Sequence, residues 1–485
     1  MTRQPMAMGT GTGMNSASCG KGTGSLGPPG FAGDLLEEDQ MRGSHGTPPA
    51  RWFRWPAGIA AAAVLGIAAS ACSAGGPTAA QVRASARARA SAEAKAQRAR
   101  AAALAAELRI TPANGTQDAN PAGGITVTSA HGPLTNVTVR TSGSPVHGSL
   151  SNGGTVWHST WALDVSQSYT VTATAREKGH AVRETSTFRT LTPSRTFQAQ
   201  IYEGSGQTYG VGMPIILYFN QRITDRAAVE RALQIRTSKP VTGAWYWDEP
   251  CNMAVTCAYF RPRDYWPQNT TVTFTGHLNG VEGAPGVYGD HTLSQTFTIG
   301  TSLIVVVSTT SHHMALYRDG RMIDYWPISA GKPGDATPEG TYLTIDKGNP
   351  VDMKGPGYNI EVPWSVRFTW SGSYLHDAYW SVGEQGFTNV SHGCVNMPPA
   401  DAETYYKMEV PGDPVTITGS PRAGTWDNGW TEWFLSWDQY LKGSALHEAV
   451  EAGPGGSSFV NPASLPPSTA TAPLQTSAPG NSRAS

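Results

Sequence analysis

Apolar and polar residues alternate in short runs through the middle of the chain. One set of runs covers residues 124–128, 137–139 and 169–174, and a second set covers residues 215–219, 271–274 and 295–299. Clusters of Gly, Pro, Asn and Ser separate the runs. A period of two between turn-forming clusters is typical of antiparallel β-sheets. The pattern therefore predicts two small β-sandwich modules, residues 109–194 and residues 195–300.

The strand pattern continues beyond residue 300. An apolar run at 303–307 is followed by two runs around the turn Asp319-Gly320, which predicts a hairpin. We expect a third β-rich domain over residues 301–420. Residues 421–444 are rich in tryptophan, and packing against that domain is favoured over a carbohydrate platform. The Pro-, Ser-, Thr- and Ala-rich residues 445–485 predict a disordered tail.

The N-terminal region has the pattern of an export signal. Two arginines precede an apolar, Ala-rich run over residues 57–71, and the run ends directly at Cys72. A membrane span needs about 20 apolar residues, so this run is short for one. Residues 69–76 resemble a bacterial lipobox, whose cysteine is lipidated. We expect residues 1–71 to be removed and Cys72 to carry a lipid anchor, with unlipidated cleavage as the alternative and Met41 as a second candidate start.

The segment after Cys72 is dominated by alanine, with several Arg and Lys residues and few acids. This composition favours a helix, but it gives no apolar stripe that a partner surface would cover. Residues 72–108 are therefore predicted to be the lipid-anchor site followed by a helical stalk. A basic tether attracted to an anionic surface and a solvated spacer are both open interpretations.

Charge and cysteine content narrow the function classes. The 35 Lys and Arg residues balance 36 Asp and Glu residues, giving a net charge of -1, so we expect no nucleic-acid partner. The 5 cysteines are scattered, and no set of them has metal-ligand spacing, so we expect no metal ion and no cofactor. Cys251 and Cys257 flank a short loop between strand-like runs, which in an oxidising compartment favours a structural disulfide.

One stretch concentrates residues that support nucleophilic chemistry. Cys394 follows His392 and Gly393 directly, and His376 lies upstream. A cysteine nucleophile needs an imidazole within hydrogen-bond reach to accept or hold its proton. The spacing alone does not choose between the two histidines. A buried structural thiol is the alternative interpretation.

The stretch Ser391-His392-Gly393-Cys394-Val395-Asn396, with His376 upstream, resembles the signature of the L,D-transpeptidase catalytic domain, the YkuD family. The element Thr337-Pro338-Glu339-Gly340-Thr341-Tyr342 is similar to a second motif of that family. With two β modules in front and a terminal Trp437-Asp438-Gln439, residues 120–443 resemble the mycobacterial type of this family. The resemblance implies two immunoglobulin-like sandwiches, a β-rich catalytic domain and a short Trp-rich subdomain, a mainly β fold.

The resemblance also implies roles for individual residues. Cys394 would be the nucleophile and His376 the general base, and the backbone carbonyl of Asp377 would orient His376, although its carboxylate could instead hold the imidazolium and raise its pKa. Backbone N–H groups near Gly393 and Cys394 would form an oxyanion hole, and residues 346–370 a lid. The residues implied to contact the donor peptide or shape the pocket are Tyr358, Ser371, Gly372, Trp380, His392 and Asn396.

The implied function is a peptidoglycan L,D-transpeptidase that forms 3→3 cross-links through a cysteine acyl-enzyme and is acylated by carbapenems. Its partners would be a donor tetrapeptide stem, an acceptor stem and the membrane, through the lipid anchor at Cys72. It would be exported and face the cell wall. The alternatives are an L,D-carboxypeptidase on the same scaffold and a non-catalytic wall-binding lipoprotein.

Overall fold

The computed structural model describes residues 78–105, 108–130, 132–177, 180–249, 251, 254–355 and 358–466. The expected signal peptide and lipidation site Cys72 therefore lie outside the described residues. Two compact units are present. The described part of the smaller one is helix α1 (Ala79–Ala105), the Ala-rich stalk segment, and its side chains are exposed over residues 78–98. None of the helices among the described residues is long and apolar enough to cross a membrane.

The first β module is a two-sheet sandwich. Its sheets have the strand orders β1-β2-β5-β4 and β3-β6-β7. Alternate side chains, including Val127, Val171 and Phe188, point inward and are buried in a core of their own. The strands are β1 (Leu108–Thr111), β2 (Thr126–Ser129), β3 (Leu134–Thr141), β4 (Gly148–Ser151), β5 (Val156–Ser159), β6 (Ser168–Glu177) and β7 (His180–Arg189).

The second module is built mostly from antiparallel strand pairs, with parallel pairing of β10 to β18 and of β8 to β17. A four-stranded sheet of order β10-β18-β15-β12 accompanies a six-stranded sheet of order β31-β30-β13-β14-β11-β9. Its elements are β8 (Arg195–Phe197), β9 (Ala199–Ile201), β10 (Thr208–Tyr209), β11 (Ile215–Phe219), α2 (Arg226–Arg231), β12 (Leu233–Thr237), β13 (Val241–Asp248), β14 (Thr256–Pro262), β15 (Thr270–Gly276), β16 (Glu282–Ala284), β17 (Val287–Gly289) and β18 (Leu293–Ile299). The mainly β fold with two sandwich modules is confirmed.

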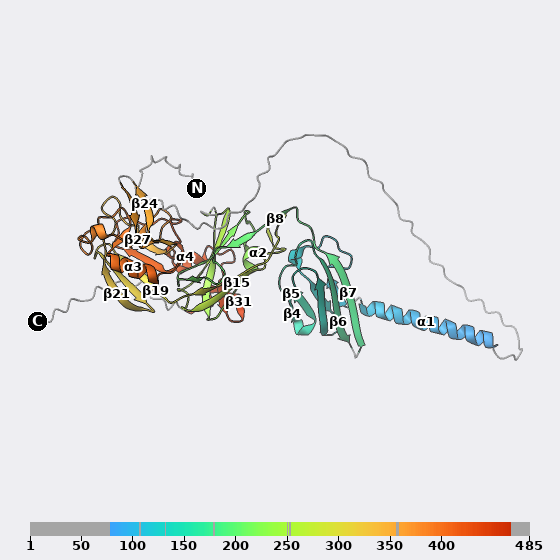
Figure 1. The fold of residues 1–485 in the computed structure, drawn as a ribbon. Helices are drawn as coiled ribbons and strands as arrows, with labels where there is room; N and C mark the ends of the chain where they lie inside the picture. Colours follow the sequence, from blue (N-terminus) through green and yellow to red (C-terminus); the bar gives the residue numbers. More distant parts are fainter. Residues whose placement is uncertain are drawn as a thin grey trace, which may run out of the picture. The chain divides into compact units, whose positions relative to one another are not determined.

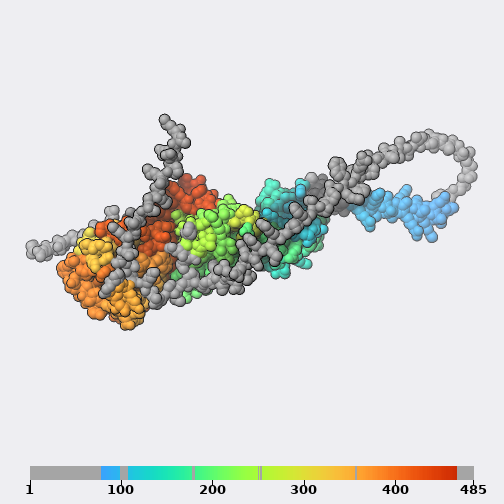
Figure 2. All heavy atoms as spheres, turned by 90° about the horizontal axis from the view of Figure 1, so that it is seen from above, coloured from blue at the N-terminus to red at the C-terminus, as the bar shows by residue number. Residues whose placement is uncertain are grey.

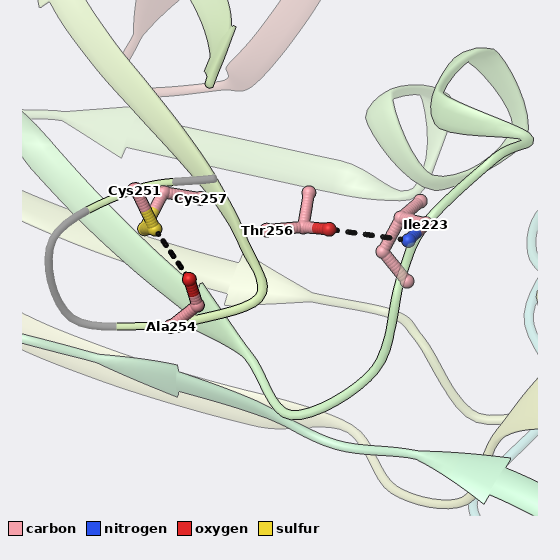
Figure 3. The surroundings of a disulfide bond; sticks show 5 residues. All are labelled: Ile223, Cys251, Ala254, Thr256 and Cys257. Atoms are coloured by element: carbon pink, nitrogen blue, oxygen red, sulfur yellow. Dashed lines mark hydrogen bonds between the residues drawn. A yellow bond between two sulfur atoms is a disulfide. The ribbon is translucent and has the colours of Figure 1, made fainter. Parts of the chain in front are cut away.

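Cys251 and Cys257 form a disulfide at the turn between β13 and β14, with their Cα atoms 6.0 Å apart. Asp248 pairs with Cys257 in the register of the two strands, so the bond closes the end of a hairpin. Figure 3 shows Thr256 beside the disulfide, where its Oγ1 accepts a hydrogen bond from the N–H of Ile223 at 3.3 Å.

The third domain combines two sheets and a hairpin (Figure 1). The five-stranded sheet has the order β21-β20-β19-β29-β22, and the four-stranded sheet has the order β23-β26-β27-β28. The elements are β19 (Leu303–Ser308), β20 (His313–Arg318), β21 (Arg321–Pro327), β22 (Gly340–Leu343), β23 (Lys347–Gly348), β24 (Val351–Gly355), β25 (Tyr358–Val362), β26 (Ser365–Arg367), β27 (Tyr374–Asp377), η3 (Tyr379–Ser381), β28 (Val395–Met397), α3 (Pro399–Met408) and β29 (Pro414–Thr418).

The C-terminal region differs from the expectation. Residues 445–485 were expected to be a disordered tail, but β30 (Ala449–Gly453) and β31 (Gly456–Val460) form a hairpin that pairs with β13 of the second module. The two figures show this red segment beside the green second module (Figures 1 and 2). Most residues of this hairpin are small, so the sequence gives only a weak strand signal. The buried surface of β30 comes from a few apolar side chains, among them Val450 and Ala452. Residues 467–485 lie outside the described part.

The Trp-rich segment packs against the third domain, as expected, and also against the second module, which was not expected. It contains η4 (Glu432–Phe434) and α4 (Trp437–Leu441). Trp430 is 3% exposed and its ring meets Tyr202 of the second module and Trp370 of the third domain edge-on. The indole N–H of Trp433 donates to the Gly212 carbonyl at 2.8 Å. These rings fasten the third domain to the second module.

Candidate active site

Two neighbouring parallel strands form the floor of the site. β27 pairs with β28, and His376 lies opposite Asn396 in their register. Cys394 comes immediately before β28, so the pairing brings it to the same place as His376. Both side chains line one cavity of about 650 Å³ while being only 3% and 1% exposed. The sequence-predicted cysteine and the upstream histidine are therefore assembled by the sheet.

The His376 ring has a defined hydrogen-bonding state. Its Nδ1 lies 2.7 Å from the backbone carbonyl oxygen of Asp377. A carbonyl oxygen only accepts, so Nδ1 carries the proton and Nε2 is the nitrogen that accepts one. Burial lowers the pKa of His376 to about 4, opposed by that carbonyl contact. His376 is therefore neutral at neutral pH.

The Asp377 carboxylate does not hold the histidine. It accepts a hydrogen bond from the Tyr379 N–H, and its Oδ1 has no hydrogen-bond partner among the described residues. Burial raises the pKa of Asp377. The expected alternative, a carboxylate contact that raises the pKa of His376, is wrong: the carbonyl makes the contact, and the pKa of His376 is lowered.

The turn before Cys394 is held by the hydroxyl of Ser391. Gly393 has a φ of 119°, a value that favours glycine. Its N–H donates to Ser391 Oγ at 3.1 Å, and Ser391 Oγ donates to the Cys394 carbonyl at 2.6 Å. The Gly393 N–H is thus engaged within the turn in this conformation, which makes it a poorer oxyanion donor than the sequence suggested.

His392 lines the cavity and has a hydrogen-bond partner that the sequence did not predict. Lys332 Nζ donates to His392 Nε2 at 2.7 Å and lies 3.5 Å from Asp335 Oδ2. The Tyr358 ring lies 5.3 Å from the His392 ring, centroid to centroid. Lys332 was missed because 60 positions separate it from His392, and its only sequence signal is its place just before the Thr337 motif. The Lys332 ammonium therefore lies behind His392 in this wall of the site.

The hairpin β24–β25 covers the cysteine, within the segment expected to be a lid. Met353 and Val362 are buried on its inner face and form a small apolar cluster with Tyr374 and Cys394. Tyr358 packs against the same cluster. Five residues of the hairpin line the cavity: Met353, Tyr358, Asn359, Ile360 and Val362. This wall is mostly apolar and limits water at the cysteine.

The opposite wall comes from η3 and the turn after it. Trp380 stacks near His376, with ring centroids 5.9 Å apart, and remains 45% exposed. Asn396 Nδ2 donates to Ser381 Oγ at 2.9 Å, so Asn396 is held from this wall. Ser381 and Glu384 also line the cavity and were missed by the sequence reasoning.

Ser371 and Gly372 are placed beside the site rather than on the cavity wall. The Ser371 N–H donates to Asn428 Oδ1 at 2.9 Å, and Asn428 Nδ2 donates back to Ser371 Oγ at 3.1 Å. The Gly372 carbonyl lies 3.9 Å from Cys394 Sγ. In the part of the chain that the structure describes, no group of three or more His, Cys, Asp and Glu residues is placed to hold a metal ion.

Two parts of the chain match known protein families. Residues 116–282 match the family model described as a bacterial Ig domain, and residues 302–417 match that of the L,D-transpeptidase catalytic domain, YkuD. The solved structure of the LD transpeptidase LdtMt1 in complex with imipenem is 32% identical and covers 47% of this chain and 100% of that chain, with a TM-score of 0.39.

Two relatives from Mycobacterium tuberculosis are matched over most of their length. L,D-transpeptidase 2 (strain CDC 1551 / Oshkosh) is 34% identical over 335 residues, which is 66% of this chain and 80% of the relative. L,D-transpeptidase 5 (strain ATCC 25618 / H37Rv) is 34% identical over 354 residues, which is 70% of this chain and 78% of the relative. Since the chain is 34% identical to each of these relatives and covers more than two thirds of each, it belongs to the L,D-transpeptidase family.

Proposed function

We propose that the protein is a peptidoglycan L,D-transpeptidase that forms 3→3 cross-links through a thioester on Cys394. The family acts on peptidoglycan stem peptides. The observation that carries the proposal is the placement of Cys394 and a neutral His376 in one cavity beneath an apolar hairpin. This arrangement supplies a nucleophile, a base and protection from water.

In the first half-reaction, the reduced Cys394 sulfur attacks the carbonyl carbon of the third residue of a tetrapeptide stem. The thiol proton passes to Nε2 of His376. Because the pKa of His376 is only about 4, transfer accompanies formation of the carbon–sulfur bond rather than preceding it. The same low pKa makes the imidazolium a strong acid, which protonates the leaving amine. The bond to the terminal D-Ala breaks, and a thioester remains.

In the second half-reaction, an amine of another stem attacks the thioester. The carbon–sulfur bond breaks, an amide forms and Cys394 regains its proton. Hydrolysis is the competing outcome, so the apolar wall of Met353, Ile360 and Val362 favours the amine by excluding water. The β modules and the stalk would space this site from a membrane anchor at Cys72, on an exported protein facing the wall.

The test is a product assay on the purified protein with tetrapeptide stems in a mild reductant. We expect D-Ala and a cross-linked dimer, and a mass increase on Cys394 after carbapenem treatment. Cys394→Ala is expected to lower D-Ala release by at least about 10³-fold, and His376→Gln by about 10²–10⁴-fold. Intact mass and chromatography of the products provide the readout.

His313→Gln is a matched control. Its Nδ1 also lies 2.7 Å from a backbone carbonyl, that of Ser311, but His313 is outside the cavity lining. This variant should keep wild-type rates. Monomeric tripeptide as the only product would instead favour an L,D-carboxypeptidase. Binding to wall material without D-Ala release, or full activity of Cys394→Ala, would contradict the enzymatic proposal and favour a wall-binding lipoprotein.

A further inference from the structure

The two walls of the catalytic cavity differ in charge. The hairpin wall presents apolar and uncharged side chains, whereas the wall formed by η3 and the following turn carries Glu384. Glu384 is the only carboxylate among the described residues that line the cavity. A single anion on the wall of a site whose second substrate is an amine is a chemical match, because a primary amine is a cation in water.

The backbone holds Glu384 in a fixed position. Its N–H donates to the Ser381 carbonyl at 3.1 Å, and its own carbonyl accepts from Phe387 at 3.0 Å and Thr388 at 2.8 Å. Ser381 Oγ in turn accepts the hydrogen bond from Asn396, two residues from Cys394. Glu384 is therefore on a braced turn connected to the floor of the site, while its side chain is exposed.

Aromatic and apolar surface adjoins this carboxylate. Tyr379, Trp380, Val382 and Phe387 are large apolar side chains that remain exposed, with Phe387 at 78%. The Tyr379 and Trp380 rings meet edge-on at 5.1 Å, and Trp380 also lines the cavity. Exposed aromatic faces attract alkylammonium groups, and they pack against the alkyl chain that carries them.

We propose that Glu384 and Trp380 form the acceptor subsite, which takes the primary ammonium on the alkyl side chain of a second stem peptide. The inference rests on the proposed function and adds which wall recognises the acceptor. The donor stem then binds against the hairpin wall. In the complete second half-reaction, the ammonium and the thioester give an amide, the Cys394 thiol and one proton released to water.

The experiment measures both half-reactions on the purified protein with tetrapeptide donor and a stem acceptor of varied concentration. Glu384→Gln is expected to raise the KM for the acceptor about three- to tenfold. The donor KM and the rate of D-Ala release without added acceptor should stay within about twofold of wild type. The product ratio therefore shifts from cross-link toward tripeptide, and Glu384→Asp should restore part of the difference.

Ionic strength gives a second readout that a packing role would not move. Added salt should raise the acceptor KM of wild type but have little effect on Glu384→Gln, because salt screens the ion pair that the variant lacks. Asp319→Asn is the charge-matched control: Asp319 is exposed on the β20–β21 turn of the same domain, at a φ of 52° that asparagine tolerates. It should leave both KM values unchanged.

The outcomes separate the two proposals. An unchanged acceptor KM and product ratio in Glu384→Gln, with normal D-Ala release, would overturn the subsite while leaving the transpeptidase intact. A parallel loss of D-Ala release would assign Glu384 to the donor and also overturn it. A wild-type protein that releases D-Ala but never forms dimer would contradict both proposals.

Discussion

The two β modules share a sandwich architecture but differ in what their cores contain. Every residue of the first module's core lies between Leu108 and Phe188. The core of the second module also includes Leu343 and Ile345 of the catalytic domain and Trp430 and Val450 of the C-terminal region. The first module is therefore a self-contained fold, whereas the second is part of the structure that supports the active site.

Among the described residues, the first module contributes no buried residue to the core of the second, although Ala162 packs against that core. The Val165 N–H donates to Asn279 Oδ1 at 3.1 Å, and the Trp161 and His277 rings stack 3.9 Å apart. The similar strand patterns of the two modules hide this difference. This difference teaches that only the second module shares a core with the catalytic domain.

Deletion of the second module gives the largest expected effect, and deletion of the first module is its control. A protein that begins at residue 193 should fold and be acylated by a carbapenem at the wild-type rate, within about twofold. A protein that begins at residue 301 exposes Ile345 and Trp430 and leaves β30 without its partner strand β13. Its loss of stability is expected to exceed about 5 kcal/mol, the lower end for a whole domain. Near-UV circular dichroism and acylation mass measure the result.

The comparison would fail in two ways. If the protein beginning at residue 301 is folded and acylated normally, the catalytic domain does not depend on the second module. If the protein beginning at residue 193 is already unfolded, the first module is not independent. Residual acylation with lost near-UV signal is not expected, because the cavity wall depends on packed elements.

A substitution at the shared core should have a smaller but still large effect. Trp430→Ala removes a ring that touches Tyr202 and Trp370, and is expected to destabilise the second module and the catalytic domain together by about 3–5 kcal/mol. Trp157→Ala is the matched control, because Trp157 is buried in the core of the first module. Calorimetry should show it lowering only that module's transition. Separate shifts of the second module and catalytic domain in Trp430→Ala would contradict a shared core.

The sequence predicted the parts of this molecule that depend on local patterns. Alternation located both modules, and the stretch around Cys394 identified the nucleophile candidate and, with His376, the site. The structure adds contacts that no local pattern encodes: Lys332 behind His392, and Glu384 on the cavity wall. Lys332 reaches the site because the fold brings a distant segment to His392, whereas Glu384 lies between His376 and Cys394 in the sequence and only its place on the cavity wall is new.

The C-terminal hairpin shows a second limit. Residues 445–460 look like a low-complexity tail because small residues dominate, yet β30 pairs with β13. Backbone pairing with an existing sheet edge needs few apolar side chains, so composition is a poor guide to such a strand. The orientation of Asp377 was open for a similar reason, since the backbone carbonyl and the carboxylate of one residue are not distinguished by sequence.

A pair of buried acids at the second module provides the last expected effect, a dependence of stability on pH. Burial, with a smaller contribution from the charge of Glu432, raises the pKa of Glu203 to about 8. Burial likewise raises the pKa of Glu432 to about 7, against the opposing effect of Arg261. Groups whose pKa is higher in the folded state bind more protons there, so their contribution to stability is complete below about pH 4.5 and is lost as pH rises through about 7 to 8.

The shared transition of the second module and catalytic domain should therefore lose stability progressively between pH 4.5 and pH 8. Glu203→Gln keeps the shape of the side chain without the titration, so it should flatten most of this dependence. Calorimetry at a series of pH values reads both transitions in one sample, and the first module serves as the internal reference. Two results would show that the pH dependence does not arise at the buried acids: an equal loss of stability in both modules, or an unchanged slope in Glu203→Gln. The contact between the second module and the catalytic domain would then not be the pH-sensitive contact.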